Sequence, residues 1–214
     1  MRFAAIPVLL LSIAFIGLSF TSGEIESLPL GAEMPKAKMK LQATDGEVYS
    51  LMDLKGPNGL LVVFSCNTCP FVVGSDRGTE GWEGRYNSLY QRATARNMNM
   101  VLVNSNAAKR DKGDSMDDMI ARQKEMGFGD IPYVLDQRSM IADAFGAKTT
   151  PHCFLFDKDG KLVYKGAIDD NCDDASGVTQ NWAIDAINNC SKGQTVEPSS
   201  TKPLGCSIKR IAQK

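Results

Sequence analysis

The feature that most constrains the fold of this chain is a pair of cysteines placed directly after a short apolar run. Residues 59–64 are apolar after their first glycine, include β-branched side chains and follow a turn-forming Pro-Asn segment, so they predict a buried strand. Cys66 and Cys69 come next, and residues 69–90 are long and mixed enough in polarity to predict a helix. The sequence therefore predicts a Cys-x-x-Cys motif at a strand-to-helix junction.

This junction favours thiol chemistry. The first N–H groups of a helix have no partner within it, and the helix dipole favours negative charge there. A thiolate at Cys66 should therefore be stabilised, and the thiolate is the reactive form of cysteine. Cys69, one turn further along, is placed to attack a mixed disulfide formed on Cys66. We predict thiol–disulfide exchange with Cys66 as the nucleophile and Cys69 as the resolving thiol.

Two alternatives to redox chemistry are a zinc site and an inert pair. A structural zinc site normally has a second ligand pair of similar spacing, whereas His152 is the only histidine and the other cysteines are isolated. These isolated cysteines are Cys153, Cys172, Cys190 and Cys206. A permanent disulfide between residues three apart closes so short a loop that it adds little stability. The motif therefore favours redox chemistry without a bound metal.

The N-terminus predicts an export signal over residues 1–23. Arg2 gives a positive start, residues 3–20 carry no charge, and residues 21–23 are small enough for cleavage. The uncharged stretch is close to the shortest length that spans a membrane, so an uncleaved anchor is the alternative. In both cases the rest of the chain is expected outside the cytoplasm, either periplasmic or secreted.

Residues 24–190 are long enough for one domain with a sizeable core, and residues 191–214, rich in Ser, Thr, Pro and Lys, predict an irregular tail. Lys and Arg number 24 against 25 Asp and Glu, and no basic run is present. This balance does not point to nucleic acid, and membrane contact is expected only if the N-terminal segment stays uncleaved. Six cysteines in an exported chain suit an oxidising compartment.

Strand and helix patterns continue along the chain. Residues 97–104 predict a second buried strand, which completes a parallel βαβ unit with the first. Residues 111–126 predict a helix whose early acids form a solvated face, because the D-x-D-x-D-G spacing of a metal loop is absent. The other predicted elements are a hairpin over 38–51, strands over 131–135, 148–156 and 161–168, and helices over 139–145 and 175–189.

This order of elements resembles the thioredoxin fold, and residues 31–56 resemble the opening of its redoxin branch, which includes peroxiredoxins. The chain is most similar to a peroxiredoxin-like, thioredoxin-like family that contains Cys-x-x-Cys. Four motifs carry the resemblance: Cys-Asn-x-Cys-Pro-Phe-Val (66–72), Thr-Pro-His (150–152), Ala-Ile-Asp-Asp-Asn (167–171) and Gly-Cys-Ser-Ile-Lys (205–209). The resemblance implies an α/β, thioredoxin-like fold with a central mixed sheet flanked by helices and an N-terminal β-hairpin extension.

The resemblance also implies how substrates bind. Pro151 would be cis and packed against the Cys-x-x-Cys motif, and the Thr150 backbone would pair with an incoming peptide strand. A trans proline that starts an edge strand is the alternative. No bound cofactor is implied. The partners would be protein or small-molecule thiols and disulfides, with an upstream dithiol as the electron donor.

One departure concerns the acid that thioredoxins bury in the strand before the motif. Residues 60–64 are wholly apolar and cannot supply it. Asp169 and Asp170 end the predicted partner strand of the Pro151 hairpin, and antiparallel pairing returns that end toward the motif. We therefore hypothesise that one of them accepts a proton from the inner cysteine, the alternative being a solvated turn.

Two other functions remain as alternatives. A thiol-dependent peroxidase is disfavoured because its P-x-x-x-T-x-x-C motif has a threonine three residues before the nucleophile, where this chain has Val63 before Cys66 and Cys66 before Cys69. A copper chaperone of the Sco type is suggested by convergence of both cysteines with His152, since thiolates and imidazole suit copper. Those proteins, however, space their cysteines by three residues rather than two.

The remaining cysteines have separate predicted roles. Cys153 should face the core as an inert small side chain. Cys172 and Cys190 lie at opposite ends of the last predicted helix, so a bridge between them requires the chain to fold back. Cys206, on the tail, can pair with either of them or act as a third redox cysteine, and the sequence leaves these alternatives open.

Overall fold

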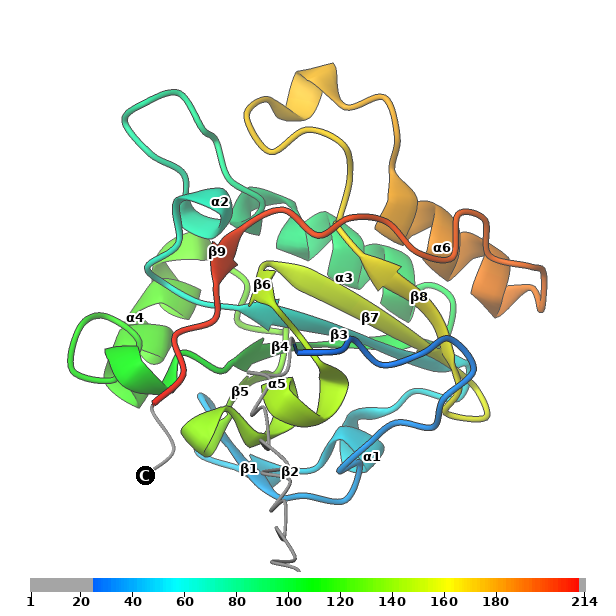
Figure 1. The fold of residues 1–214 in the computed structure, drawn as a ribbon, viewed down its shortest axis with the longest axis horizontal. Coiled ribbons are helices and arrows are strands. Elements are labelled where there is room, and N and C mark those ends of the chain that lie inside the picture. Colours follow the sequence, from blue (N-terminus) through cyan, green and yellow to red (C-terminus); the bar gives the residue numbers. More distant parts are fainter. Residues whose placement is uncertain (1–24, 212–214) are drawn as a thin grey trace, which may run out of the picture.

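A seven-stranded mixed sheet forms the centre of the molecule (Figure 1). The structure is a computed structural model that describes residues 25–211, so the predicted signal over 1–23 lies outside the described residues. The strand order is β2-β1-β5-β4-β3-β7-β8, and β6 and β9 form a separate two-stranded sheet. The strands are β1 (Leu41–Ala43), β2 (Val48–Tyr49), β3 (Gly59–Ser65), β4 (Asn99–Asn104), β5 (Tyr133–Leu135), β6 (Thr149–Thr150), β7 (His152–Asp157), β8 (Leu162–Gly166) and β9 (Cys206–Ser207).

The sheet is mixed because its centre is parallel and its sides are antiparallel. Strands β3, β4 and β5 run parallel, whereas β7 pairs antiparallel with β3, and β8 with β7. The predicted N-terminal hairpin, β1–β2, is added through antiparallel pairing of β1 with β5. The α/β, thioredoxin-like fold expected from the sequence is therefore confirmed.

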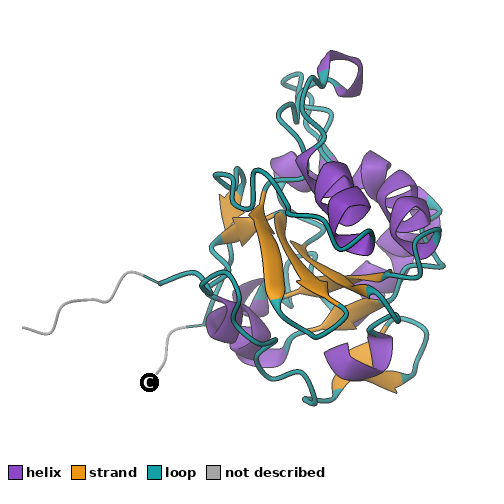
Figure 2. Cartoon of the chain, turned by 90° about the vertical axis from the view of Figure 1, so that its right-hand side faces the viewer, coloured by secondary structure: helices purple, strands orange, loops and turns teal. Residues whose placement is uncertain are grey.

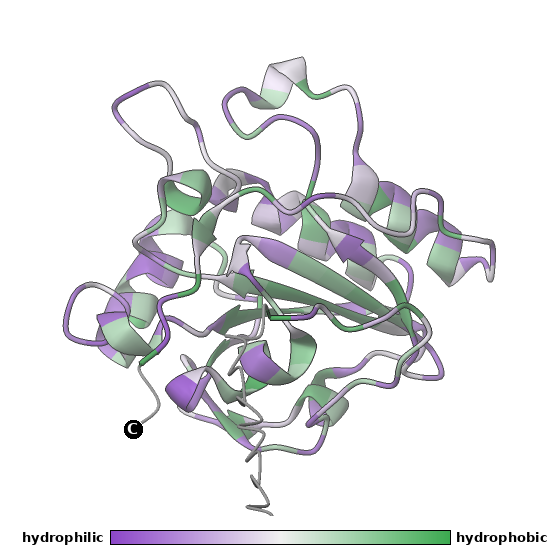
Figure 3. Cartoon of the chain, in the orientation of Figure 1, coloured by the Kyte–Doolittle hydropathy of each residue, from purple (hydrophilic) through white to green (hydrophobic). Residues whose placement is uncertain are grey.

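Helices cover both faces of the sheet (Figure 2). They are α1 (Leu51–Leu54), α2 (Pro70–Val73), α3 (Tyr86–Thr94), α4 (Met116–Met126), α5 (Met140–Phe145) and α6 (Trp182–Ser191), with 3-10 turns η1 (Glu83–Arg85), η2 (Ala107–Lys109), η3 (Gln137–Ser139) and η4 (Ala175–Gly177). Strand β3 is buried throughout because its side chains alternate between two cores. Leu61 and Val63 face the core under α3 and α6, and Leu60, Val62 and Phe64 face the core under α1 and α5. The central strands are accordingly among the most hydrophobic segments (Figure 3).

The helix predicted over residues 69–90 is wrong. It divides into the four-residue helix α2, a loop, the turn η1 and the helix α3. Gly74 ends α2 with a φ of 81°, and Gly81 has a φ of 79°, both in the region that favours glycine. A Cβ at Gly81 would lie 2.4 Å from the carbonyl oxygen of Val72. The chain therefore turns back against α2 at Gly81, and this close approach excludes one continuous helix over residues 69–90.

Several other predicted boundaries shift. Helix α4 begins at Met116 because Ser115 and Asp118 form a capping box, and Gly127 ends it in the left-handed conformation. The helix predicted over 175–189 begins only at Trp182, after the turn η4. The second strand of the hairpin ends at Tyr49, since Ser50 caps α1.

The C-terminal tail follows the sheet instead of leaving it. From the end of α6 it runs back across the molecule to β9 (Figure 1). Its backbone pairs with β8, where the N–H of Lys165 lies 3.1 Å from the oxygen of Ser199 and the N–H of Thr201 lies 3.0 Å from the oxygen of Lys165. The tail is irregular except for β9, which pairs antiparallel with β6. In the part of the chain that the structure describes, no helix is long and apolar enough to cross a membrane.

Candidate functional site

The two cysteines of the motif lie where β3 passes into α2. Cys66 follows the last residue of β3, and Cys69 is the N-cap of α2. Pro70 occupies the first helical position, where its missing N–H costs no hydrogen bond. Both cysteines are buried, with 1% and 2% of their surfaces exposed. All six cysteines lie within residues 25–211, and all are free thiols.

Thr150 contacts both sulfur atoms. Its hydroxyl lies 3.1 Å from the Sγ of Cys66, and its carbonyl oxygen accepts from the protonated thiol of Cys69 at 3.1 Å. The Thr150–Pro151 peptide bond is cis. The structure therefore brings Cys66, Cys69, Thr150 and Pro151 together at one place, where β6 leads into β7.

A third cysteine joins this group from the tail. Strand β9 pairs with β6 so that Cys206 lies opposite Thr150. The backbone N–H of Cys206 donates to the Sγ of Cys69 across 3.3 Å, and the two side chains also form a hydrogen bond. Cys206, a candidate redox cysteine by sequence, therefore touches the inner member of the motif.

The pair of motif cysteines is arranged to hold one negative charge. The hydrogen bond from the Cys66 thiol lowers the pKa of Cys69 to about 5, and the donors on Cys206 act in the same direction against burial. The same bond raises the pKa of Cys66, and burial and the Asp114 carboxylate add to that effect. These effects favour Cys69 as the charged member of the pair, whereas the sequence predicts Cys66.

Asp114 is the acid beside the motif, and sequence reasoning missed it. Its carboxylate is buried and accepts hydrogen bonds from the backbone N–H of Asn67 (2.7 Å) and the hydroxyl of Thr68 (2.8 Å). The side-chain amides of Asn104 and Asn106 complete its partners. The prediction that the acids near residue 111 form a solvated face is therefore wrong for Asp114. Asn104 and Asn106, at the carboxyl end of β4, could have indicated a polar site beside the motif. Strands β3 and β4 are parallel, so both end at the same edge of the sheet.

The two acids proposed from the sequence lie elsewhere. Asp169 is 4% exposed and accepts hydrogen bonds from the Nε1 of Trp82 and from Arg85, each at 2.7 Å. Asp170 is exposed and accepts from the hydroxyl and backbone N–H of Thr179. Within residues 25–211, no hydrogen bond joins either carboxylate to a motif cysteine. The carboxylate that contacts the motif is Asp114, through Asn67 and Thr68.

His152 does not converge with the cysteines. It pairs with Phe64 across β3 and β7, and its ring lies 4.5 Å from that of Phe154, on the opposite side of the sheet from the motif. Its Nδ1 accepts from the backbone N–H of Lys148 at 3.3 Å. Among the described residues, no group of three or more His, Cys, Asp or Glu side chains is arranged to hold a metal ion. The ligand set assumed for a copper chaperone is therefore wrong.

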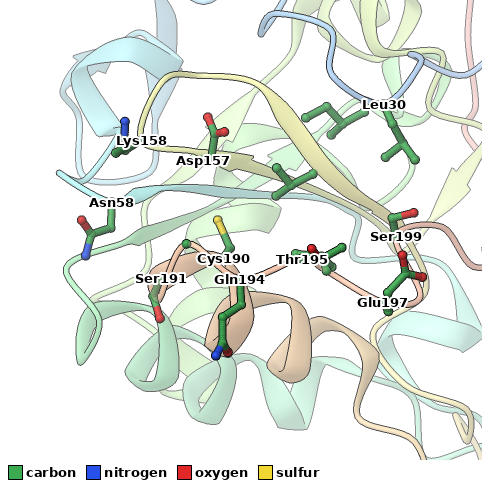
Figure 4. A pocket seen from close by; sticks show the side chains of 14 residues that line it. Leu30, Asn58, Asp157, Lys158, Cys190, Ser191, Gln194, Thr195, Glu197 and Ser199 are labelled. Carbon is green, nitrogen blue, oxygen red and sulfur yellow. The ribbon is translucent and has the colours of Figure 1, made fainter.

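The other cysteines lie outside the site. Cys153 is fully buried in β7, and burial raises its pKa. Cys172 is buried near the loop after α2, with its carbonyl oxygen 2.9 Å from the N–H of Gly81. Cys190 faces a different pocket of about 530 Å³, lined by the end of α6, the tail and the β7–β8 turn (Figure 4). None of the bridges considered for Cys172, Cys190 and Cys206 is formed in the described chain.

Comparison with known proteins agrees with this geometry. The family model described as Redoxin matches residues 29–180. A hypothetical protein from Sinorhizobium meliloti 1021 is 30% identical, with a TM-score of 0.76 over 88% of this chain and 98% of that one. An uncharacterized conserved protein from Geobacillus kaustophilus is also 30% identical, with a TM-score of 0.76 over 87% of this chain and 94% of that one.

More distant structures share the fold alone. The peroxidoxin BcpB from Mycobacterium tuberculosis is 14% identical, with a TM-score of 0.52 over 77% of this chain and 96% of that one. No curated protein matches the chain. The family match and the buried cysteine pair together support thiol-based redox activity. With more than half of its length matched by one family model, this chain belongs to the Redoxin family.

Proposed function

We propose that the protein is an exported thiol–disulfide oxidoreductase that uses the Cys66–Cys69 pair on protein or small-molecule substrates. The observation that carries the proposal is the contact of both sulfurs with Thr150, each at 3.1 Å, beside a bond that lowers the pKa of Cys69. A buried dithiol that shares one charge has a nucleophile and a resolving thiol within reach of each other. Export rests on the signal-like composition of residues 1–23.

The roles of the two cysteines follow from the charge. The Cys69 thiolate attacks a sulfur of the substrate disulfide, forms a mixed disulfide and releases one substrate thiolate, which takes up a proton. Cys66 then loses its proton and attacks the sulfur of Cys69, which forms the Cys66–Cys69 disulfide and releases the second substrate thiol. The hydroxyl of Thr150, 3.1 Å from the Sγ of Cys66, can donate to that sulfur while it is charged. This order reverses the one expected from the sequence.

Peroxide reduction is the second candidate. A thiolate of low pKa is also what attack on a peroxide needs, and the relative BcpB bears the name peroxidoxin. Against it, the position three residues before Cys69 holds the thiol of Cys66 rather than a hydroxyl. We therefore rank peroxidase activity second.

The first test is insulin disulfide reduction by the full chain, with dithiothreitol as donor and peroxide consumption measured in parallel. We expect turnover on insulin that is lost in both Cys66→Ser and Cys69→Ser and unchanged in Cys190→Ser, whose cysteine faces another pocket. With excess substrate, Cys66→Ser combined with Cys206→Ser should accumulate a mixed disulfide on Cys69, since neither neighbouring thiol is left to resolve it. Peroxide turnover without insulin turnover would contradict the proposal, and trapping only in Cys69→Ser would contradict the order of attack.

A further inference from the structure

Strand β9 occupies the edge at which a substrate peptide would pair. The resemblance to thioredoxins assigns the Thr150 backbone to an incoming strand, and in this chain that backbone is already paired with Cys206. The neighbouring pair is Thr149 with Ser207, and the strands run antiparallel. The chain thus carries its own strand, with a cysteine in it, at the place where a foreign cysteine would be presented.

The tail is held there by contacts on both sides of β9. Before it, Gly205 passes so close to β6 that a Cβ would lie 2.2 Å from the carbonyl oxygen of Thr150. After it, the N–H of Ile208 donates to the oxygen of Lys148 at 3.1 Å, and the N–H of Lys209 donates to the Oδ1 of Asn106 at 2.9 Å. These contacts hold Cys206 beside Cys69, whose Sγ accepts from the Cys206 backbone N–H at 3.3 Å.

The three cysteines differ in burial, and this difference suggests a role for Cys206. Cys66 and Cys69 are 1% and 2% exposed, so they offer little surface to the thiol of a folded partner while the tail is docked. Cys206 is only partly buried. We propose that Cys206 is a third redox cysteine, which exchanges with the Cys66–Cys69 disulfide and presents the oxidised sulfur to partner thiols at the surface. The inference rests on the proposed dithiol chemistry and deepens it.

The exchange is balanced within the chain. The thiol of Cys206 loses its proton and attacks the sulfur of Cys69, which forms a Cys69–Cys206 bond and breaks the Cys66–Cys69 bond. Cys66 leaves as a thiolate and takes up a proton, so no net oxidation occurs in this step. A partner thiolate then attacks Cys206, which forms a mixed disulfide and frees Cys69. A second partner thiol resolves that bond, so two partner thiols are oxidised and the protein gains two thiols.

The proposal is specific to one of the four cysteines outside the motif. Burial raises the pKa of Cys206 to about 11, and its bond to Cys69 adds to that effect, so the thiol stays protonated beside the Cys69 thiolate. Once Cys69 is part of a disulfide it carries no charge, and it no longer raises the pKa of Cys206. In the described part of the chain, no hydrogen bond links Cys153, Cys172 or Cys190 to the motif.

The first experiment maps disulfides in the full-length Cys66→Ser variant, equilibrated in a glutathione buffer, quenched with acid and digested without reduction. We expect a Cys69–Cys206 disulfide, because β9 holds Cys206 beside Cys69 and Cys66 can no longer pair with Cys69. The matched control, Cys66→Ser with Cys206→Ser, should carry only glutathione on Cys69. A Cys66→Ser protein in which Cys206 stays a free thiol, or pairs with another cysteine, would overturn the proposal.

The second experiment measures the rate at which the oxidised protein oxidises a reduced protein substrate. Cys206→Ser should slow this reaction by about tenfold or more, since an intramolecular step is lost, while Cys190→Ser keeps the rate of the wild type. Gly205→Ala should undock β9 and prevent the Cys69–Cys206 bond without removing any sulfur. If Cys206→Ser and Gly205→Ala both react faster than the wild type, the tail only shields the motif from partners, and the proposal is wrong.

Separate results would contradict the dithiol activity and the role of Cys206. If the wild type does not form a Cys66–Cys69 disulfide and turns over neither insulin nor a protein thiol, the proposed function fails. If the wild type turns over and Cys206→Ser matches it, only the proposed role of Cys206 fails. The disulfide mapping in Cys66→Ser tests that role independently of turnover.

Discussion

Asp169 and Asp170 are neighbours in sequence, yet they have opposite environments. Asp169 is buried against Trp82 and Arg85, and Asp170 is exposed and contacts Thr179. Removing one partner of a buried ion pair leaves an unpaired charge, which is more costly than losing an exposed contact. At the scale of single residues, burial rather than position in the motif decides how much each carboxylate contributes to the stability of the fold.

We therefore expect Asp169→Asn to lower the free energy of unfolding by roughly 3–5 kcal/mol, because Arg85 loses its close, buried carboxylate and keeps only the half-exposed Glu80 at 3.6 Å. Asp170→Asn, the matched control, should leave urea denaturation close to that of the wild type. If Asp170→Asn alters the pH profile of insulin reduction, the sequence-based hypothesis of a proton acceptor regains support. Equal destabilisation by both variants would contradict this reading of their environments.

His152 should make the protein sensitive to acid. Burial lowers its pKa from 6.5 to about 3, so the folded state favours the neutral ring. A group whose folded pKa is depressed contributes stability that is complete above its unfolded pKa and is lost as pH falls. This contribution should therefore decrease from about pH 6.5 downward, toward about pH 3.

The variant His152→Asn tests this effect, since its amide oxygen can still accept from the N–H of Lys148 but does not titrate. Urea denaturation of both proteins between about pH 7 and pH 4 should show a smaller loss of stability in the variant. As the only histidine, His152 can also be titrated directly by NMR. A ring that titrates near its usual value would contradict the prediction.

Among the secondary-structure elements, the loop between α2 and η1 shows how glycines shape the site. Gly81 turns the chain back so that its N–H meets the oxygen of Cys172 at 2.9 Å. A side chain there would meet the backbone of Val72 and Gly74, each at 2.4 Å, and would need a left-handed φ. Gly84, three residues on, has open space around its Cα and an ordinary φ.

We expect Gly81→Ala to destabilise the protein by more than about 1 kcal/mol and Gly84→Ala to be neutral or slightly stabilising. Thermal unfolding of both variants measures the difference. Because Gly81 packs on α2, its substitution should also slow insulin reduction. Equal melting temperatures for the two variants would show that the close approach at Gly81 is not needed.

The elements that local pattern determines were predictable. The strand before Cys66, the Thr-Pro before β7 and the end of α4 at Met126 each have a signal within a few residues. The broken helix and the burial of Asp114 depend on contacts between distant segments, which no local pattern encodes. The same holds for the side of the sheet that His152 faces, since one residue of register would reverse it.

At the scale of the whole molecule, the tail runs from the edge strand β8 past β6 to η2 and α5. It contacts β8, β6 and η2 in turn, and ends with an ion pair of 2.6 Å between Arg210 and Asp143. Its composition predicted an irregular segment, and most of it is irregular. What composition could not indicate is that an irregular backbone can be fixed by pairing with strand edges.

A chain that ends after Lys202 lacks β9 and should expose the motif. We expect Cys66 and Cys69 to react faster with iodoacetamide than in the full chain, measured by mass spectrometry, because β9 no longer pairs with Thr150. Cys153, buried in β7, should stay slow and thereby report that the sheet is intact. Unchanged reactivity of the motif would mean that the tail does not shield it.

The pairing of β8 has a consequence for how copies of the protein meet. As the last strand of the sheet, β8 would present free backbone groups to solvent, and such an edge invites another chain to add a strand. Leu162 instead exchanges hydrogen bonds with Gly31 and Ala32, and Lys165 with Ser199 and Thr201. Segments from both ends of the described chain thus cap this edge, which protects the protein against edge-to-edge aggregation.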